Sequence, residues 1–357
     1  MAPGDTPADR DRTSAWDTVP VPSEHIRSRP TLSVVMPTHG RRHSLPTVLA
    51  PLLEDPSIDE LFVVVDGSRD GSFEWLQQTS IRHPRLVPIF RERAGGAQVA
   101  RAAGLERASG DVVLFLDDDV LAGRGLAGGH LAHHEQRAGT VVVGYMPVAL
   151  PPRRRPGQFP SYLYAEEYQR RCVEYEAMPS SILRNLWWGN VSMRRSQGLA
   201  VGLVSPGFER SYHEDKDFGL RCLVAGLEGV FDRRLVADHL HARDIDAFAR
   251  DARSQGAARV ILHQRHGDLI GALSPTAFSE GLAPPLSRLV ERSRNPRVAS
   301  SASAVLRATT VAAGALRWYG LETRTGKLLR RVNQRSGAQA VLSDQGVLDR
   351  HSVAGSR

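Results

Sequence analysis

The feature that most constrains this chain is the alternation of short apolar runs with helix-like segments between residues 31 and 116. The apolar runs are rich in Val, Ile and Leu and end in turn residues, whereas the segments between them repeat apolar residues at helical spacing. Strands that alternate with helices form a parallel sheet with right-handed crossover connections. The sequence therefore predicts an α/β fold in which a mostly parallel sheet is flanked by helices.

Polar residues follow the predicted strands, at the carboxyl ends where such sheets bind ligands. Thr38 follows the first strand, Asp66 the second, and Asp117, Asp118 and Asp119 the fourth. Three adjacent carboxylates repel one another, so we expect a positive charge among them. Asp oxygens suit Mg²⁺ or Mn²⁺, and alternate residues of an extended segment point the same way. We therefore expect Asp117 and Asp119 to share a metal with substrate phosphates while Asp118 points elsewhere; the structural alternative is an exposed acidic turn.

Composition narrows the classes of function. The formal net charge is +7, but no basic stripe with interleaved aromatic residues occurs, so we expect no nucleic-acid partner. Cys172 and Cys222 match no metal or redox spacing, which favours a reducing, cytoplasmic setting. No run reaches the ~18 apolar residues of a membrane span. Residues 1–30 are polar and Pro-rich without an apolar core, and we expect them to be a disordered leader.

The part of the chain after residue 242 differs in character from the part before it. Residues 243–335 have helical spacing and are predicted to form a helical C-terminal region, followed by a disordered tail at 336–357. The arginines of "GKLLRRVNQR" suggest peripheral contact with the inner membrane surface, whereas a plain structural cap is the alternative. The sequence leaves the oligomeric state open.

Six motifs, in order, resemble those of the family 2 glycosyltransferases: "VVMPTHGR", "VVVDGSRDGS", "GGAQVARAAGLERASGDVVLFLDDDV", "WWGNVSMRR", "GFERSYHEDKDFGLRCLVAG" and "HLH". The resemblance covers roughly residues 31 to 241 and implies the Rossmann-like GT-A fold of nucleotide-diphospho-sugar transferases for a domain at 31–242. It implies an inverting, hexosyltransferase-type enzyme with a UDP-sugar donor, an acceptor hydroxyl and a bound Mn²⁺ or Mg²⁺.

The resemblance also assigns roles to individual residues. It implies contacts with the nucleotide sugar from Pro37, Thr38, Asp66, Gly96, Arg101, Asp117, Asp118, Gly189 and Asn190. Asp117 and Asp119 match the family's DxD motif and, with His241, are the metal candidates. Asp215 matches the catalytic base, and Glu214 is the second choice. An acceptor hydroxyl is a weak nucleophile at neutral pH, so a carboxylate must take its proton.

Other residues carry both a functional and a structural interpretation. Trp187 and Trp188 are candidates to stack on sugar or acceptor rings, although packing accounts equally well for at least one of them. Asp217 is interpreted as a first-turn charge of a helix, and His239 is assigned to packing.

Three alternative functions were weighed. A dinucleotide-binding oxidoreductase needs a G-x-G-x-x-G turn directly after the first strand, where this chain has "PTHGRR". A nucleotidyltransferase calls for a basic, Gly-rich triphosphate loop at the same place, with which "PTHGRRHS" is marginally compatible. A noncatalytic nucleotide-sugar-binding relative would not need Asp117, Asp119 and Asp215, all of which are present.

Overall fold

One mixed sheet carries the predicted site residues along one edge. The computed structural model describes residues 30–208 and 212–354. The strands of this part are β1 (Leu32–Thr38), β2 (Glu60–Asp66), β3 (Leu86–Arg91), β4 (Val112–Leu116), β5 (Val120–Ala122), β6 (Thr140–Tyr145), β7 (Asn190–Arg194) and β8 (Glu228–His239). They lie in the order β3-β2-β1-β4-β7-β6-β8-β5. Neighbours from β3 to β4 are parallel, and β7 runs antiparallel to both β4 and β6.

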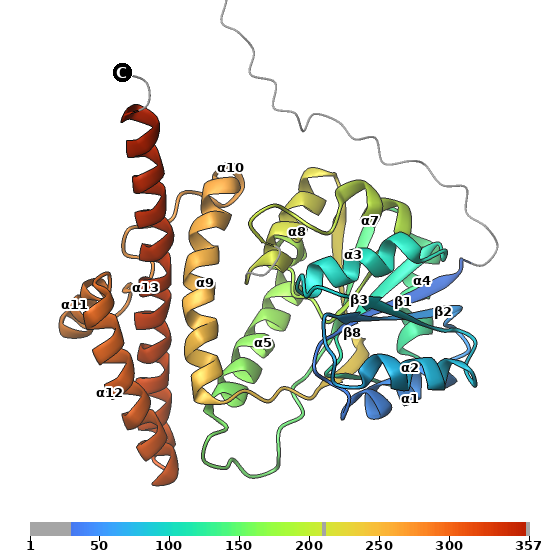
Figure 1. Cartoon of the computed structure of the whole chain (residues 1–357), viewed down its shortest axis with the longest axis horizontal. Coiled ribbons are helices and arrows are strands. Elements are labelled where there is room, and N and C mark those ends of the chain that lie inside the picture. The colour runs from blue at the N-terminus through green and yellow to red at the C-terminus, as the bar shows by residue number, and fades with distance from the viewer. Residues whose placement is uncertain (1–29, 209–211, 355–357) are drawn as a thin grey trace, which may run out of the picture.

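Helices cover both faces of this sheet (Figure 1). The helices are α1 (Leu45–Glu54), α2 (Ser72–Ser80), α3 (Ala97–Arg107), α4 (Leu126–Gln136), α5 (Phe159–Ala177), α6 (Ser181–Arg184), α7 (Arg195–Val201), α8 (Glu214–Val224), α9 (Ile245–Arg265), α10 (Gly267–Ile270), α11 (Pro284–Arg292), α12 (Pro296–Ala315) and α13 (Tyr319–Ala354). Val34 and Met36 of β1 pack towards α1, whereas Val35 faces α3, because successive strand residues point to opposite faces. The predicted α/β fold is confirmed.

Two strand predictions needed correction. The stretch "GVFDRRLVADHLHARD", residues 229–244, is typical in sequence of a short strand pair, but it forms most of the single strand β8 and the residues after it, with a register shift against Gly144 and Tyr145 of β6. The sequence analysis missed β5, a three-residue strand directly after the aspartates, which pairs antiparallel with β8. With three residues, β5 is too short to show the alternation by which a strand is recognised from the sequence.

The C-terminal region is helical, as predicted, but its helix extends further. Residues 336–357 were expected to be disordered, yet α13 continues to Ala354. The reason is close packing against α9: a Cβ at Gly256 would collide with the backbone of Gln334, and one at Gly337 with the backbone of Arg253. Residues 1–29 and 355–357 lie outside the described residues. Within the described part, no helix combines the length and apolar character needed to cross a membrane.

The arginines expected to contact a membrane are already used within the protein. Arg330 makes two hydrogen bonds of 2.7 Å to Glu167, Arg331 donates to the carbonyls of Phe278 and Glu280, and Arg335 pairs with Glu291 at 3.2 Å. They fasten α13 to the rest of the molecule. The choice of these residues for a membrane contact was therefore wrong.

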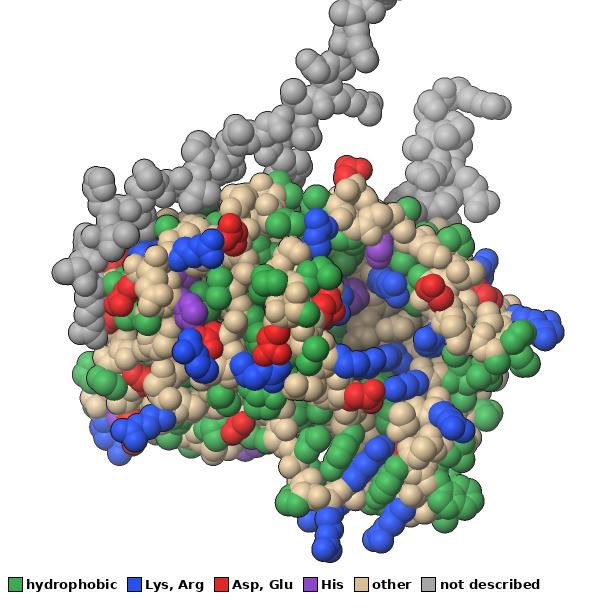
Figure 2. Space-filling model, turned by 180° about the vertical axis from the view of Figure 1, so that it is seen from behind, with side chains coloured by type: hydrophobic (Ala, Val, Ile, Leu, Met, Phe, Trp, Pro, Cys, Tyr) green, Lys and Arg blue, Asp and Glu red, His purple; other side chains and the backbone are tan. Residues whose placement is uncertain are grey.

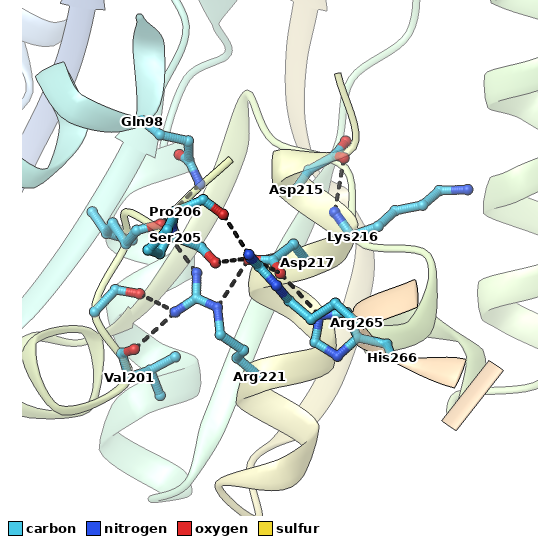
Figure 3. Close-up of polar contacts among 12 residues, drawn as sticks. Gln98, Val201, Ser205, Pro206, Asp215, Lys216, Asp217, Arg221, Arg265 and His266 are labelled. Atoms are coloured by element: carbon cyan, nitrogen blue, oxygen red, sulfur yellow. Dashed lines mark hydrogen bonds and ion pairs between the residues drawn. The ribbon is translucent and has the colours of Figure 1, made fainter. Parts of the chain in front are cut away.

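A buried carboxylate fastens α8 to the end of α9 (Figure 3). Asp217, in the first turn of α8, has Oδ2 2.9 Å from Arg221 Nε and Oδ1 2.9 Å from His266 Nε2 and 3.3 Å from Arg265 Nη1. Arg221 also donates to the carbonyls of residues 201–203, and Arg265 donates to the Ser205 hydroxyl and to the carbonyl of Pro206. Burial would raise the pKa of Asp217, but His266 and Arg221 hold it below its usual range. The structural interpretation of Asp217 agrees with this position.

We expect Asp217→Asn to lower the free energy of unfolding by about 3–5 kcal/mol, because it leaves buried cationic partners uncompensated. Chemical denaturation at neutral pH measures the change. Asp246→Asn is the matched control, since the pair of Asp246 with Arg307 is about half exposed and should contribute about 0–1 kcal/mol. Equal losses in the two variants would contradict the importance of the buried cluster.

Candidate active site

A cavity of about 1250 Å³ opens at the carboxyl ends of β1, β2 and β4. Its other walls come from α5, the segment 185–188, the start of α8, the residues after β8, and α9. Figure 2 shows this face as a hollow with basic and histidine side chains at its rim. A second cavity of about 180 Å³, near Leu52 and His83, contains none of the predicted site residues.

The large cavity brings together most of the predicted site residues. Those in its lining are Pro37, Thr38, Asp66, Gly96, Arg101, Asp117, Asp118, Asp119, Trp187, Trp188, Glu214, Asp215 and His241. Gly189 and Asn190 are instead placed behind the wall. Asn190 is buried, accepts from His130 and donates to the carbonyl of Leu235. Gly189, at φ +110°, has no room for a side chain because a Cβ would lie 2.7 Å from the sulfur of Met146.

Asp66 organises the loop at the nucleotide end of the cavity. Its carboxylate accepts from the backbone N–H of Gly95 at 2.9 Å and of Gly96 at 2.7 Å, and it pairs with Arg91. Gly96 adopts φ +94° and is the N-cap of α3, so it turns the chain from this loop into the helix. The first residues of α3 line the cavity, which places the positive end of the helix dipole there.

The three aspartates lie in a turn, because β4 ends at Leu116. The alternation expected of an extended segment is therefore absent, and Asp118 lines the cavity with its neighbours instead of pointing elsewhere. Burial raises the pKa of Asp118 to about 6. The exposed acidic turn is excluded, since this carboxyl group is largely covered.

Cations of the protein accompany the aspartates. Arg101 forms an ion pair with Asp117, and Arg41 Nη2 lies 3.1 Å from Asp119 Oδ2. His239 Nε2 lies 3.4 Å from the other oxygen of Asp119. Burial acts to raise the pKa of Asp119, but His239 and Arg41 together lower it below its usual range. Asp119 is therefore held as the anion near neutral pH.

The donor set fits a metal ion that is shared with a ligand. Within residues 30–208 and 212–354, no group of three or more His, Cys, Asp or Glu side chains is arranged to hold a metal alone. Mg²⁺ and Mn²⁺, however, commonly bind one or two carboxylates together with substrate phosphates. Asp117 and Asp119 supply such oxygens, and Nε2 of His239 lies 3.4 Å from Asp119 Oδ1.

The histidine beside the aspartates is His239 and not His241. The ring of His241 stacks on Tyr164 with centroids 4.4 Å apart, and its Nδ1 lies 3.1 Å from Ser161 Oγ. Burial lowers the pKa of His241 to about 4, so the ring is neutral near pH 7. The sequence analysis assigned His239 to packing, because the pairing of β5 with β8 that brings it to Asp119 depends on tertiary structure.

The two tryptophans have different surroundings. Trp187 is half-buried on the cavity wall, with its ring edge-on to Tyr164 at 5.2 Å. Trp188 is 4% exposed and packs on Phe115, while the guanidinium of Arg101 lies 5.0 Å above its ring. Trp187 is thus the tryptophan placed to meet a ligand, and Trp188 supports Arg101.

Glu214 and Asp215 occupy the first turn of α8 and face the cavity. Burial raises the pKa of both carboxyl groups, and the neighbouring Asp215 raises that of Glu214 further. The backbone N–H of Lys216 donates to Asp215 Oδ1 at 2.8 Å. This pair combines a raised pKa with a recessed position, which are the properties of a proton acceptor in a reaction near neutral pH.

Several residues of the cavity lining were not expected from the sequence to be site residues, among them Arg41, Tyr164, Lys216 and His239. Arg41 had a recognisable signal, because it follows the first strand in the same way as Thr38. Tyr164 had none, since it reaches the cavity through the packing of α5.

Comparisons with known proteins agree with this arrangement. Residues 33–203 match the family described as "Glycosyl transferase family 2". The chain is 24% identical over 251 residues to the "Uncharacterized glycosyltransferase YfnE" of Bacillus subtilis (strain 168), covering 58% of this chain and 64% of that protein. It is 38% identical over 94 residues to an "Undecaprenyl-phosphate 4-deoxy-4-formamido-L-arabinose transferase" of Pseudomonas savastanoi pv. phaseolicola, covering 25% of this chain and 28% of the other. The chain thus spans less than two thirds of these curated relatives.

A solved structure supports the fold over nearly the whole chain. The mannosyltransferase PcManGT from Pyrobaculum calidifontis, in complex with GDP-Man and Mn²⁺, superimposes with a TM-score of 0.56 at 16% identity, covering 93% of this chain and 91% of that one. Residues 33–203 are therefore a glycosyltransferase family 2 domain, and the chain has the GT-A fold.

Proposed function

We propose that this protein is an inverting glycosyltransferase that moves a hexosyl group from a nucleoside diphosphate sugar to an acceptor hydroxyl. One observation carries the proposal: a single cavity holds the strand-end aspartates and the carboxylate pair of α8, with Arg101 between its polar walls. The first set is suited to a metal and diphosphate, and the second to removing a proton. A dinucleotide-binding or purely structural site would need only one of these sets.

The donor occupies the strand-end side of the cavity. The first turn of α3 and the guanidinium groups of Arg41 and Arg101 favour a diphosphate there. Asp66 holds the loop before α3 in place. Its carboxylate oxygens can accept further hydrogen bonds, and in this proposal they accept from the ribose or the base. The relative bound to GDP-Man and the sequence-based expectation of a UDP-sugar make both nucleotides candidates.

Asp119 and Asp117 would hold Mn²⁺ or Mg²⁺, with His239 in the place expected for His241. When bound, the cation stabilises the negative charge of the departing diphosphate. Arg101 and Arg41 already neutralise these aspartates and remain beside the diphosphate oxygens. Bound Mn²⁺ in PcManGT supports the choice of metal.

Asp215 is the base in this proposal. The acceptor oxygen attacks the anomeric carbon from the face opposite the diphosphate, so that the new C–O bond forms as the bond to the phosphate oxygen breaks. The hydroxyl proton passes to the Asp215 carboxylate, and the nucleoside diphosphate leaves as the anion. Trp187 and Tyr164 form the wall on which the acceptor or sugar ring packs.

The acceptor and the place of action are proposed from the name of a relative and from the state of the cysteines. A relative named as an undecaprenyl-phosphate transferase makes a lipid-linked acceptor a candidate, and with it a position at the inner membrane surface. Cys172 and Cys222 are free buried thiols, which accords with a cytoplasmic setting.

Thermal denaturation with UDP-sugars and GDP-sugars, each with and without Mn²⁺, tests the donor site. We expect one nucleotide sugar to raise the melting temperature in the presence of Mn²⁺, since a ligand at 100 times its Kd stabilises by about 2.7 kcal/mol. In Asp119→Ala the part of the rise in melting temperature that depends on Mn²⁺ should be lost, whereas Asp118→Asn, the matched control, should keep it. Stabilisation by NAD and by no nucleotide sugar would refute the proposed function.

Asp215→Asn should reduce kcat by about 10²–10⁴-fold while the donor Kd stays the same, because a general base contributes that factor to the rate and little to binding. Steady-state kinetics and donor calorimetry measure the two quantities. Glu214→Gln is the comparison and should lose less. A larger loss in Glu214→Gln would transfer the role to Glu214, and full activity in Asp215→Asn would refute the assignment.

The pH dependence of kcat supplies a separate test. The base must be deprotonated, and burial raises the pKa of Asp215 above its usual value. We therefore expect kcat to fall as the pH is lowered through a midpoint above the ordinary Asp value of about 3.9. An acid limb at or below that value would show that Asp215 does not limit the rate.

A further inference from the structure

An apolar face on the second half of α12 and the turn after it points away from the rest of the protein. Ala304, Ala308, Val311 and Ala315 are exposed at spacings of four, three and four residues, which puts them on one face of the helix. The exposed apolar residues of this region are here called the hairpin patch: Ala304, Val305, Ala308, Val311, Ala312, Ala315, Leu316, Trp318 and Leu321. Val305 is 65% exposed, Leu316 58% and Trp318 60%. The opposite face of α12 is buried against α13.

The stretch of sequence that carries the hairpin patch is basic, although Arg307, Arg330 and Arg335 in it are paired with Asp246, Glu167 and Glu291 of other helices. Glu322 is the only acidic residue between 296 and 343, and it is buried in an ion pair with Arg154. The same stretch contains Arg297, Arg307, Arg317, Arg324, Lys327, Arg330, Arg331 and Arg335. Of these, Arg317 and Arg324 are exposed beside Trp318 and Leu321 along the chain.

The arginine loop before α5 adds charge to the same place. Arg154 lies 4.6 Å from the ring of Tyr319, and the Tyr319 hydroxyl donates to the Arg154 carbonyl at 3.0 Å. Arg153 and Arg155 are therefore held next to the start of α13; both are exposed, and neither has an ion-pair partner within the described part of the chain. The lower lobe of Figure 2 shows blue and green side chains with no red among them.

We propose that the hairpin patch docks on an anionic lipid surface, with α12 lying along the membrane and its apolar face among the headgroups and upper acyl chains. An amphipathic helix with apolar and aromatic residues on one face and arginines at its edges binds at this depth. Anionic lipids attract the flanking arginines. A second copy of this chain fits less well, because a two-fold contact would bring Arg317 and Arg324 of both copies together.

Docking in this way would bring the cavity close to the membrane. Gly326 of α13 packs directly against the ring of Phe159 in α5. Pro160, which follows Phe159 in the chain, lines the cavity. The helix that follows the hairpin patch is thus in direct contact with the start of α5, which forms part of the cavity wall. Lipid binding itself does not depend on sugar transfer, so this inference stands or falls separately from the proposed function.

Sedimentation of the full chain with vesicles tests the proposal. We expect at least tenfold stronger partitioning onto phosphatidylglycerol–phosphatidylcholine vesicles than onto pure phosphatidylcholine, and a decrease as salt rises. Leu316→Ser combined with Trp318→Ser should reduce partitioning at least tenfold, and Arg153→Ser combined with Arg155→Ser should weaken both binding and its salt dependence. Ile81→Ser is the matched control, because Ile81 is 81% exposed elsewhere, and it should bind like the unaltered chain.

Tryptophan quenching by brominated lipids locates the contact. Quenching should occur in the unaltered chain and be largely lost in Trp318→Phe, while circular dichroism confirms that the variant is folded. Failure to bind anionic vesicles would overturn the proposal, as would binding that the patch variants leave unchanged. Light scattering that shows a dimer abolished by Trp318→Ser would overturn it in favour of self-association.

Discussion

The site depends on keeping several carboxylates ionised in a recessed place. Asp66, the three aspartates after β4 and the pair at the start of α8 all line one cavity, where burial raises carboxyl pKa values and like charges repel. The protein offsets this cost with Arg91 at the end of β3, Arg41 after β1 and Arg101 in α3. The parallel sheet brings those segments to one edge, so the fold and the charge balance of the site are inseparable.

This balance divides the acidic groups by task. Asp117 and Asp119 each lie beside a cation of the protein, and His239 and Arg41 lower the pKa of Asp119 against the effect of burial. Their oxygens are suited to a metal and a diphosphate. Glu214 and Asp215 have raised pKa values and are suited to accept a proton. Environments that push the pKa values of neighbouring acids apart are typical of sites that carry out acid and base chemistry near neutral pH.

The helical region after β8 belongs to the same functional unit. Asp217 joins the helix that carries the proposed base to the end of α9, while Arg330 of α13 pairs with Glu167 of α5 at the cavity. Helices α9 and α13 approach closely at Gly256 and Gly337. The surface proposed to meet lipid is therefore rigidly connected to the wall proposed to meet the acceptor.

The sequence by itself determined the parallel sheet and the edge at which its polar strand-end residues gather, because strand periodicity and the residues after each strand are local features. It also identified Asp215 and the aspartates through ordered motifs. Only the tertiary structure decided that Asp118 shares the cavity, that His239 replaces His241 beside Asp119, and that Asn190 lies behind the wall. These outcomes depend on where β4 ends, on the pairing of β5 with β8, and on side chains that meet across many residues. Such long-range contacts leave no periodic trace in the chain. For the same reason, the exposed face of α12 and the pairing of Arg330 and Arg335 with other helices emerged only once the helices were packed together.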